Sequence, residues 1–197
     1  MSERVLLFDV ETTGKADMKA SVTAPHQPRI VQLAALLIDG ERELACLNVV
    51  IKPEGFLIPQ DAAKIHGITD EIAWQIGVYA APTLAIFNDL INHADWIVGH
   101  NIPFDIFCAQ VELSHRGYAN PFADKPTFCT MRSSTDICKL PGPYGYKWPK
   151  LSEVYKFAFQ EDLQNSHNAM VDLRATLRVY NWLKDLLATK ATEGVPA

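Results

Sequence analysis

The sequence has few cysteines and lacks long apolar runs. Its 197 residues contain four cysteines, at positions 46, 108, 129 and 138, and none forms a CxxC pair or another zinc-like spacing. No apolar run approaches the ~20 residues that cross a bilayer. The N-terminus turns acidic within eleven residues and shows no signal-peptide pattern. We therefore expect a cytoplasmic protein without membrane association, whose reduced thiols mostly fill the core.

The chain also lacks an excess of positive charge. It has 18 Lys and Arg against 23 Asp and Glu, a net charge of -5. Proteins that hold nucleic acid along its backbone are usually basic, because their affinity comes from neutralised phosphates. The charge therefore argues against a protein that coats nucleic acid in bulk. Hydrophobic residues make up 48% of the chain, which is typical of a globular domain with a full core.

The order of patterns along the chain predicts one α/β layered domain over residues 1–189. The tail, residues 190–197, is polar, and we expect it to be disordered. Residues 15–28 are expected to form a flexible loop, and residues 118–150 are expected to be irregular outside a short strand and a short helix. The predicted strands are 4–10, 30–39, 44–52, 95–100 and 127–131, and the predicted helices are 61–67, 81–94, 103–117, 133–138, 151–159 and 168–188.

Two acids stand at the end of the first predicted strand. Asp9 and Glu11, in LLFDVETTG, are two residues apart and therefore project from the same side of a strand. Two carboxylates facing the same space repel each other and raise each other's pKa unless a cation lies between them. Alone, this pair would fit a solvated strand end better than a metal site.

Two more acids lie in predicted helices. Asp105, in GHNIPFD, falls in a first turn, where the helix dipole would favour an acid whatever its function. Asp172, in HNAMVDLRAT, lies in an otherwise apolar helix between Ala169 and Ala175, small residues that let the helix approach the sheet closely. His167 precedes Asp172 by five residues and is expected in the loop that enters this helix. Carboxylates that hold two hard cations, with an imidazole that accepts a proton, suit phosphodiester hydrolysis.

Together these segments resemble the DEDDh family of 3′-to-5′ exonucleases, which includes the proofreading epsilon subunit of bacterial DNA polymerase III. The family's three motifs are matched by FDVETTG, HNIPFD and HNAMVD, in the right order, over roughly residues 5–180. A histidine rather than a tyrosine stands five residues before the last aspartate, which indicates the h subtype. The resemblance implies a ribonuclease H-like fold: a mixed five-stranded sheet with one antiparallel strand and helices on both faces.

The resemblance also implies a role for each motif residue. Two ions, Mg²⁺ or Mn²⁺, would be held by Asp9, Glu11, Asp105 and Asp172, and His167 would be the general base. Such ions would add about +4 at the scissile phosphate, so a negative net charge does not oppose a nuclease. The implied substrate contacts are Thr12, Thr13, His66 and Asn101.

The implied reaction is removal of 5′-mononucleotides from 3′ ends, preferably of single-stranded DNA or 3′ overhangs. The alternatives are an exoribonuclease similar to RNase T or oligoribonuclease, and a proofreading subunit acting with a polymerase. A protein that only binds nucleic-acid ends would be marked by loss of a metal ligand, and none is lost. The sequence does not decide whether the protein forms a homodimer. The short segment after Ala188 does not indicate a polymerase-binding domain.

One segment departs from these motifs. Residues 141–150, PGPYGYKWPK, interleave three aromatic residues with Lys147 and Lys150. Aromatic rings beside cations can stack on bases of single strands. We expect instead that this loop packs its rings against the domain, and stacking on nucleic acid is the alternative.

Overall fold

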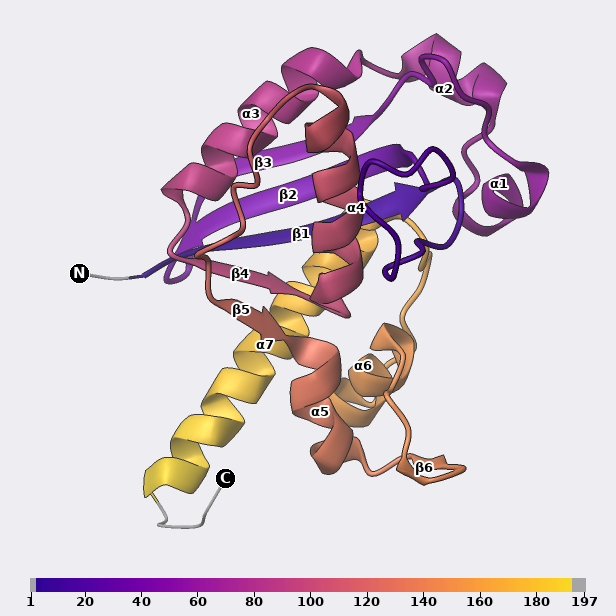
Figure 1. Cartoon of the computed structure of the whole chain (residues 1–197). Coiled ribbons are helices and arrows are strands. Elements are labelled where there is room, and N and C mark those ends of the chain that lie inside the picture. The colour runs from indigo at the N-terminus through magenta and orange to yellow at the C-terminus, as the bar shows by residue number, and fades with distance from the viewer. Residues whose placement is uncertain (1–2, 193–197) are drawn as a thin grey trace.

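A mixed five-stranded sheet forms the centre of the computed structural model, which describes residues 3–192 (Figure 1). The strand order is β3 (Arg42–Val50), β2 (Ile30–Asp39), β1 (Arg4–Thr12), β4 (Trp96–Gly99) and β5 (Thr127–Cys129). Only β2 runs antiparallel to its neighbours within this sheet, because the β1–β4 and β4–β5 pairs are parallel. The predicted mixed sheet with one antiparallel strand is confirmed.

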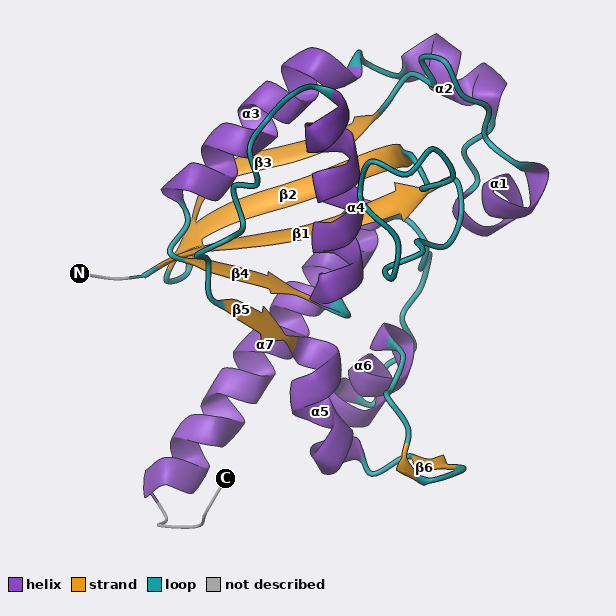
Figure 2. Cartoon of the chain, in the orientation of Figure 1, coloured by secondary structure: helices purple, strands orange, loops and turns teal. Residues whose placement is uncertain are grey.

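The two faces of the sheet are covered by different helices (Figure 2). Successive side chains of a strand point to opposite faces, and β1 is apolar on both. Leu6 and Phe8 pack in a core with α3 (Ala80–His93) and α4 (Ile102–His115). Val5 and Leu7 pack with α7 (Ala169–Thr192) on the other face. β1 is therefore a central strand whose apolar side chains are buried on both faces and whose C-terminal end lies between the two helical layers.

The remaining elements lie at the two ends of this layered core. The segment between β3 and α3 forms α1 (Gln60–His66) and α2 (Asp70–Ile76), and the segment after β5 forms α5 (Thr130–Cys138), β6 (Pro141–Gly142), β7 (Gly145–Tyr146) and α6 (Leu151–Phe159). Helix α2 and the β6–β7 hairpin were not predicted from the sequence. No helix within residues 3–192 has the length and hydropathy of a membrane-spanning segment.

Several boundaries differ from the sequence-based prediction. β1 extends to Thr12, which was predicted in a turn, and β5 ends at Cys129 because the following residues already form α5. α7 runs to Thr192, so residues 190–192 are helical, and the rest of the predicted tail lies outside the described residues. The loop 15–28 contains no helix or strand, but its backbone is organised around the buried side chain of Gln27, which donates to the carbonyls of Asp17 and Ser21.

A buried ion pair ties α4 to the start of β2. Arg29 donates from Nε and Nη2 to the two carboxylate oxygens of Glu112, at 2.7 and 2.9 Å, and Glu112 is 1% exposed. The same carboxylate accepts the backbone N–H of Ile30 at 3.0 Å. The backbone of Arg29 in turn exchanges hydrogen bonds with Thr13. This pair therefore fixes the turn that follows β1.

Replacing Arg29 should destabilise the fold strongly. Arg29→Ala would leave the charge of Glu112 buried without a partner, a change that typically costs about 3–5 kcal/mol. We expect the urea midpoint to fall accordingly. The matched control is Arg4→Ala, which removes the exposed pair with Asp95 and should have a much smaller effect. Equal losses in the two variants would contradict the role assigned to the buried pair.

Candidate active site

A cavity of about 350 Å³ opens at the C-terminal end of β1. Its lining residues come from β1, the start of α4, the start of α6 and the start of α7. They are Asp9, Val10, Glu11, His100, Asn101, Phe104, Asp105, Leu151, His167 and Asp172. The fold therefore brings the four predicted metal ligands and the predicted base into one cavity, although they are up to 163 residues apart in the chain.

β2 supports the side of the cavity formed by α7. Asp9 and Glu11 lie on the face of β1 that α7 covers, and Glu11 is paired in register with Gln32. The buried side chain of Gln32 accepts the backbone N–H of Ala169 at 3.2 Å. Asn168 caps the same helix, because its Oδ1 accepts the N–H groups of the second and third residues that follow it. The first turn of α7, which carries Asp172, is thus fixed against the end of the sheet.

Helix α4 brings Asp105 to the same point. Asn101, which precedes the helix, has φ 64°, a left-handed conformation that asparagine adopts more readily than most residues. A Cβ on Gly99 would approach Ile102 Cδ1 to 2.6 Å, so a larger residue at this position would displace the side chain of Ile102. Asp105 is 4% exposed and accepts the backbone N–H of Val10 at 3.3 Å. This hydrogen bond fixes the start of α4 to β1.

His167 lies in the loop before α7, as its spacing from Asp172 predicted. It is exposed, has φ 67°, and donates its backbone N–H to Asp172 Oδ2 at 2.9 Å. One potential ligand atom from each of Glu11, His167 and Asp172 lies within 4.8 Å of the other two. Asp172 Oδ1 is buried and has no hydrogen-bond partner among the described residues. An oxygen in this position is suited to a cation.

The acids raise one another's pKa. Burial raises the pKa of Asp9 and Asp105 well above the usual range, and the charges of the neighbouring acids raise both further. Burial, followed by the charge of Asp172, raises the pKa of Glu11 to about 7. Burial also raises the pKa of Asp172, although the N–H of His167 acts in the opposite direction. Divalent cations would reverse these shifts, because they favour the charged form of every acid in the cluster. The residues therefore fit a site for hard cations.

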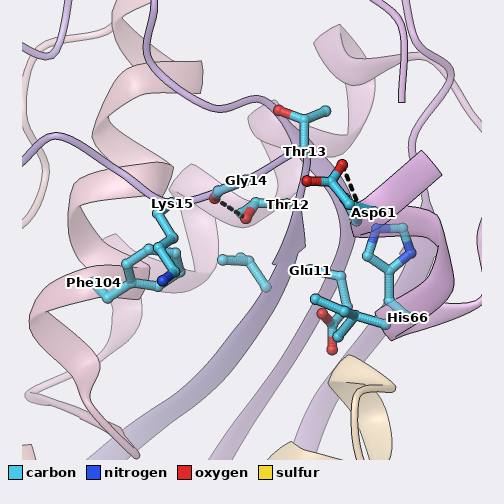
Figure 3. A pocket seen from close by; sticks show the side chains of 11 residues that line it. Glu11, Thr12, Thr13, Gly14, Lys15, Asp61, His66 and Phe104 are labelled. Atoms are coloured by element: carbon cyan, nitrogen blue, oxygen red, sulfur yellow. Dashed lines mark hydrogen bonds between the residues drawn. The ribbon is translucent and has the colours of Figure 1, made fainter. Parts of the chain in front are cut away.

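A second cavity, of about 520 Å³, adjoins the first (Figure 3). Val10, Glu11 and Phe104 line both cavities. In Figure 3, Phe104 and Lys15 lie on one side, and Glu11 and His66 lie on the other. The full lining is Val10, Glu11, Thr12, Thr13, Gly14, Lys15, Asp61, Ala62, Ile65, His66 and Phe104.

The structure places three of the four predicted substrate contacts in the second cavity. These are Thr12, Thr13 and His66, whereas Asn101 lines the cavity of the acids. Sequence reasoning missed Phe104, although it directly precedes Asp105 in a predicted first turn, and it missed Ile65, directly before His66. Both were overlooked because an apolar residue in an amphipathic helix is normally assigned to the core.

Comparisons with known proteins agree with this geometry. A 3′-5′ exonuclease, DinG, from Bacillus subtilis is 25% identical over 186 residues, which cover 93% of this chain and 18% of DinG. A DNA polymerase III subunit epsilon from Buchnera aphidicola is 28% identical over 173 residues, which cover 86% of this chain and 67% of that protein. A zinc-bound complex of Escherichia coli exonuclease I with single-stranded DNA has a TM-score of 0.73 at 23% identity.

The last match covers 93% of this chain and 41% of the exonuclease I chain, and at that identity it shows a shared fold. The chain thus spans a minor part of DinG and of exonuclease I. The RNase T family model, described as exonuclease, matches residues 6–180. This range includes every residue that lines the two cavities. The cluster of acids, the fold and this match lead to one conclusion: the chain belongs to the RNase T exonuclease family.

Proposed function

We propose that this protein is a metal-dependent 3′-to-5′ exonuclease that releases 5′-mononucleotides from single-stranded DNA or 3′ overhangs. The observation that carries the proposal is the convergence of four acids and His167 on one cavity, beside a second cavity large enough for a nucleotide. The family match supports hydrolysis of nucleic acid. A runner-up is an exoribonuclease, because base-stacking pockets accept both sugars.

The acids would hold the metal ions. Asp9, Glu11 and Asp172 share one face of the site, and Asp105 approaches from α4. All four offer hard oxygen ligands, which favour Mg²⁺ or Mn²⁺. Bound ions would supply Lewis-acid chemistry at the scissile phosphate and lower the pKa of the attacking water. The zinc-bound complex of exonuclease I supports a divalent site in this fold.

His167 would take the proton from the attacking water. Its ring lies at the exposed side of the acid cavity, within reach of Glu11 and Asp172. Its backbone N–H is bound to Asp172, which holds the loop beside the acids. A neutral imidazole with this placement can accept a proton from water and release it to solvent.

The second cavity would hold the terminal nucleotide. Phe104 and Ile65 offer apolar surface for the base and sugar. His66 Nδ1 accepts the N–H of Ile68 at 3.1 Å, which places the ring hydrogen on Nε2. Nε2 is buried and makes no hydrogen bond of normal geometry with the described residues. Burial lowers the pKa of His66, although the nearby backbone of Thr12 acts in the opposite direction. The neutral ring thus presents one donor that a nucleotide oxygen would satisfy.

Loss of one metal ligand should remove activity. Asp172→Asn keeps the size of the side chain but removes its charge, so we expect turnover to fall by more than the ~100-fold typical of residues that only support a metal ligand. Asp185→Asn, on the exposed face of the same helix, is the matched control and should retain activity. The assay follows a 5′-labelled oligonucleotide with Mg²⁺ and with EDTA. Full activity of Asp172→Asn, or activity in EDTA, would refute the metal site.

The metal-free protein should lose stability as pH rises above neutral. The acids bind protons more strongly in the folded chain than in the unfolded chain, because their pKa values are raised on folding. Their contribution is therefore complete at low pH and is lost as pH rises through the folded values, about 7 for Glu11. In EDTA, we expect a lower Tm at pH 8.0 than at pH 6.5, and Mg²⁺ should raise Tm more at pH 8.0.

Between pH 6.5 and 8.0, the pH dependence of stability reports on these acids and not on His100. Burial lowers the pKa of His100 to about 4, so His100 costs stability only as pH falls below its unfolded value of about 6.5. Glu11→Gln should reduce the pH dependence between 6.5 and 8.0 in calorimetric scans. The same Tm at both pH values in EDTA would contradict the raised pKa values of the acids in the metal-free protein.

A further inference from the structure

The β6–β7 hairpin and the residues after it expose three aromatic rings. We call Tyr144, Tyr146, Trp148 and Arg132 the hairpin platform. The three aromatic residues are 103%, 51% and 63% exposed, respectively. The expectation that this loop packs its rings against the domain is therefore wrong. Large exposed aromatic groups on a monomer indicate a binding surface when they are clustered.

The platform is joined directly to the acid cavity. His100, which lines that cavity, donates from Nε2 to the carbonyl of Pro149 at 3.0 Å, and its Nδ1 lies 2.9 Å from Thr130 Oγ1. Leu151, two residues after Pro149, also lines the cavity. Trp148 therefore directly precedes a segment fixed at the mouth of the site. Figure 1 shows the hairpin beyond α5 and α6, on the side away from α1 and α2.

The hairpin is held in place at both ends. Lys147 donates its backbone N–H to the carbonyl of Leu140 at 3.0 Å, and its Nζ lies 2.5 Å from Glu153 Oε1. The other oxygen of Glu153 accepts the backbone N–H of Lys150 at 2.8 Å. The rings are thus presented on a restrained segment, which lowers the entropic cost of binding.

The charge of this region differs in sign from that of the whole chain. Residues 130–150 contain four cations, Arg132, Lys139, Lys147 and Lys150, and one acid, Asp136; of the cations, Lys147 is paired with Glu153. The chain as a whole has five more acids than cations. The guanidinium of Arg132 lies 6.0 Å from the centroid of the Trp148 ring, and no ion pair of Arg132 is present within residues 3–192. Aromatic rings interleaved with cations suit a polyanion that carries flat bases.

We propose that the hairpin platform binds the single strand on the 5′ side of the scissile nucleotide, by stacking bases on Trp148 and Tyr144 and by contacting phosphates with Arg132. This inference rests on the proposed exonuclease function and adds to it a second contact region. The occupant is single-stranded nucleic acid, since stacked and paired bases in a duplex would not present their faces to the rings. The platform would hold the strand while the terminal nucleotide lies in the cavity beside Phe104.

The test compares a long and a minimal substrate. The long substrate is a dT oligomer of 20 nucleotides, and the minimal one is the p-nitrophenyl ester of thymidine 5′-monophosphate, which has no strand on the 5′ side. For Trp148→Ala and for Tyr144→Ala, we expect KM for the oligomer to rise about five-fold or more, as loss of one stacked base predicts. Hydrolysis of the ester should stay unchanged. An unchanged KM for the oligomer, or equal losses on both substrates, would overturn the proposal.

Matched variants separate stacking from general effects. Trp74→Ala removes a tryptophan that is 51% exposed on α2 and should leave both substrates unaffected. Trp148→Tyr keeps an aromatic ring and should restore most of the affinity. Thermal melting checks that each variant folds, and Tyr144 is fully exposed, so its removal leaves the core intact.

A binding measurement keeps the two proposals distinguishable. If the wild type hydrolyses neither substrate, the exonuclease proposal fails. Fluorescence anisotropy with the labelled dT oligomer then still tests the platform, in the wild type and in Trp148→Ala. A five-fold weaker Kd for the variant supports the platform, and equal Kd values, or no binding by either protein, refute it.

Discussion

Keeping four carboxylates together in a partly desolvated cavity is the constraint on which the site depends. Burial raises the pKa of Asp9 and Asp105 most strongly, and the charges of the neighbouring acids raise it further. A loop could not hold such a group, because it would move to let the charges separate. The chain instead attaches the acids to a buried central strand and to the first turns of two helices that pack on opposite faces of the sheet.

Backbone amides hold the two helices against the sheet beside the acids. The N–H of Val10 binds Asp105, the N–H of His167 binds Asp172, and the N–H of Ala169 binds Gln32 on the neighbouring strand. The first and third of these bonds join segments that are distant in the sequence, and the second fixes the loop before α7 to the first turn of that helix. The repulsion between the acids is therefore opposed by neutral donors, which keep the carboxylates in position without cancelling the charge that cations need.

Local patterns in the sequence were sufficient to predict the central strands and the residues of the acid cluster. The apolar run of β1, the hairpin at Asp39-Gly40 and the spacing of His167 and Asp172 each depend on a few neighbouring residues. The missed features depend on distant contacts. The hydrogen bond of Gln32 depends on the start of α7. The exposure of Trp148 depends on the helices among residues 3–192, none of which covers its ring. Helix α2 had a local signal that was overlooked, Thr69 as its N-cap before two acids.

Helix α7 combines packing and chemistry within a single turn. Ala169 and Leu173 lie in the core against β1, while Asp172, one position from Leu173, reaches the acid cavity. A helix turns about 100° per residue, so inserting or deleting one residue inside this turn would rotate the carboxylate away from its partners. Changes in length in the preceding loop, before His167, meet no such limit. Natural variants of this chain should accordingly accumulate insertions before residue 166 and keep the interval from His167 to Leu173 constant.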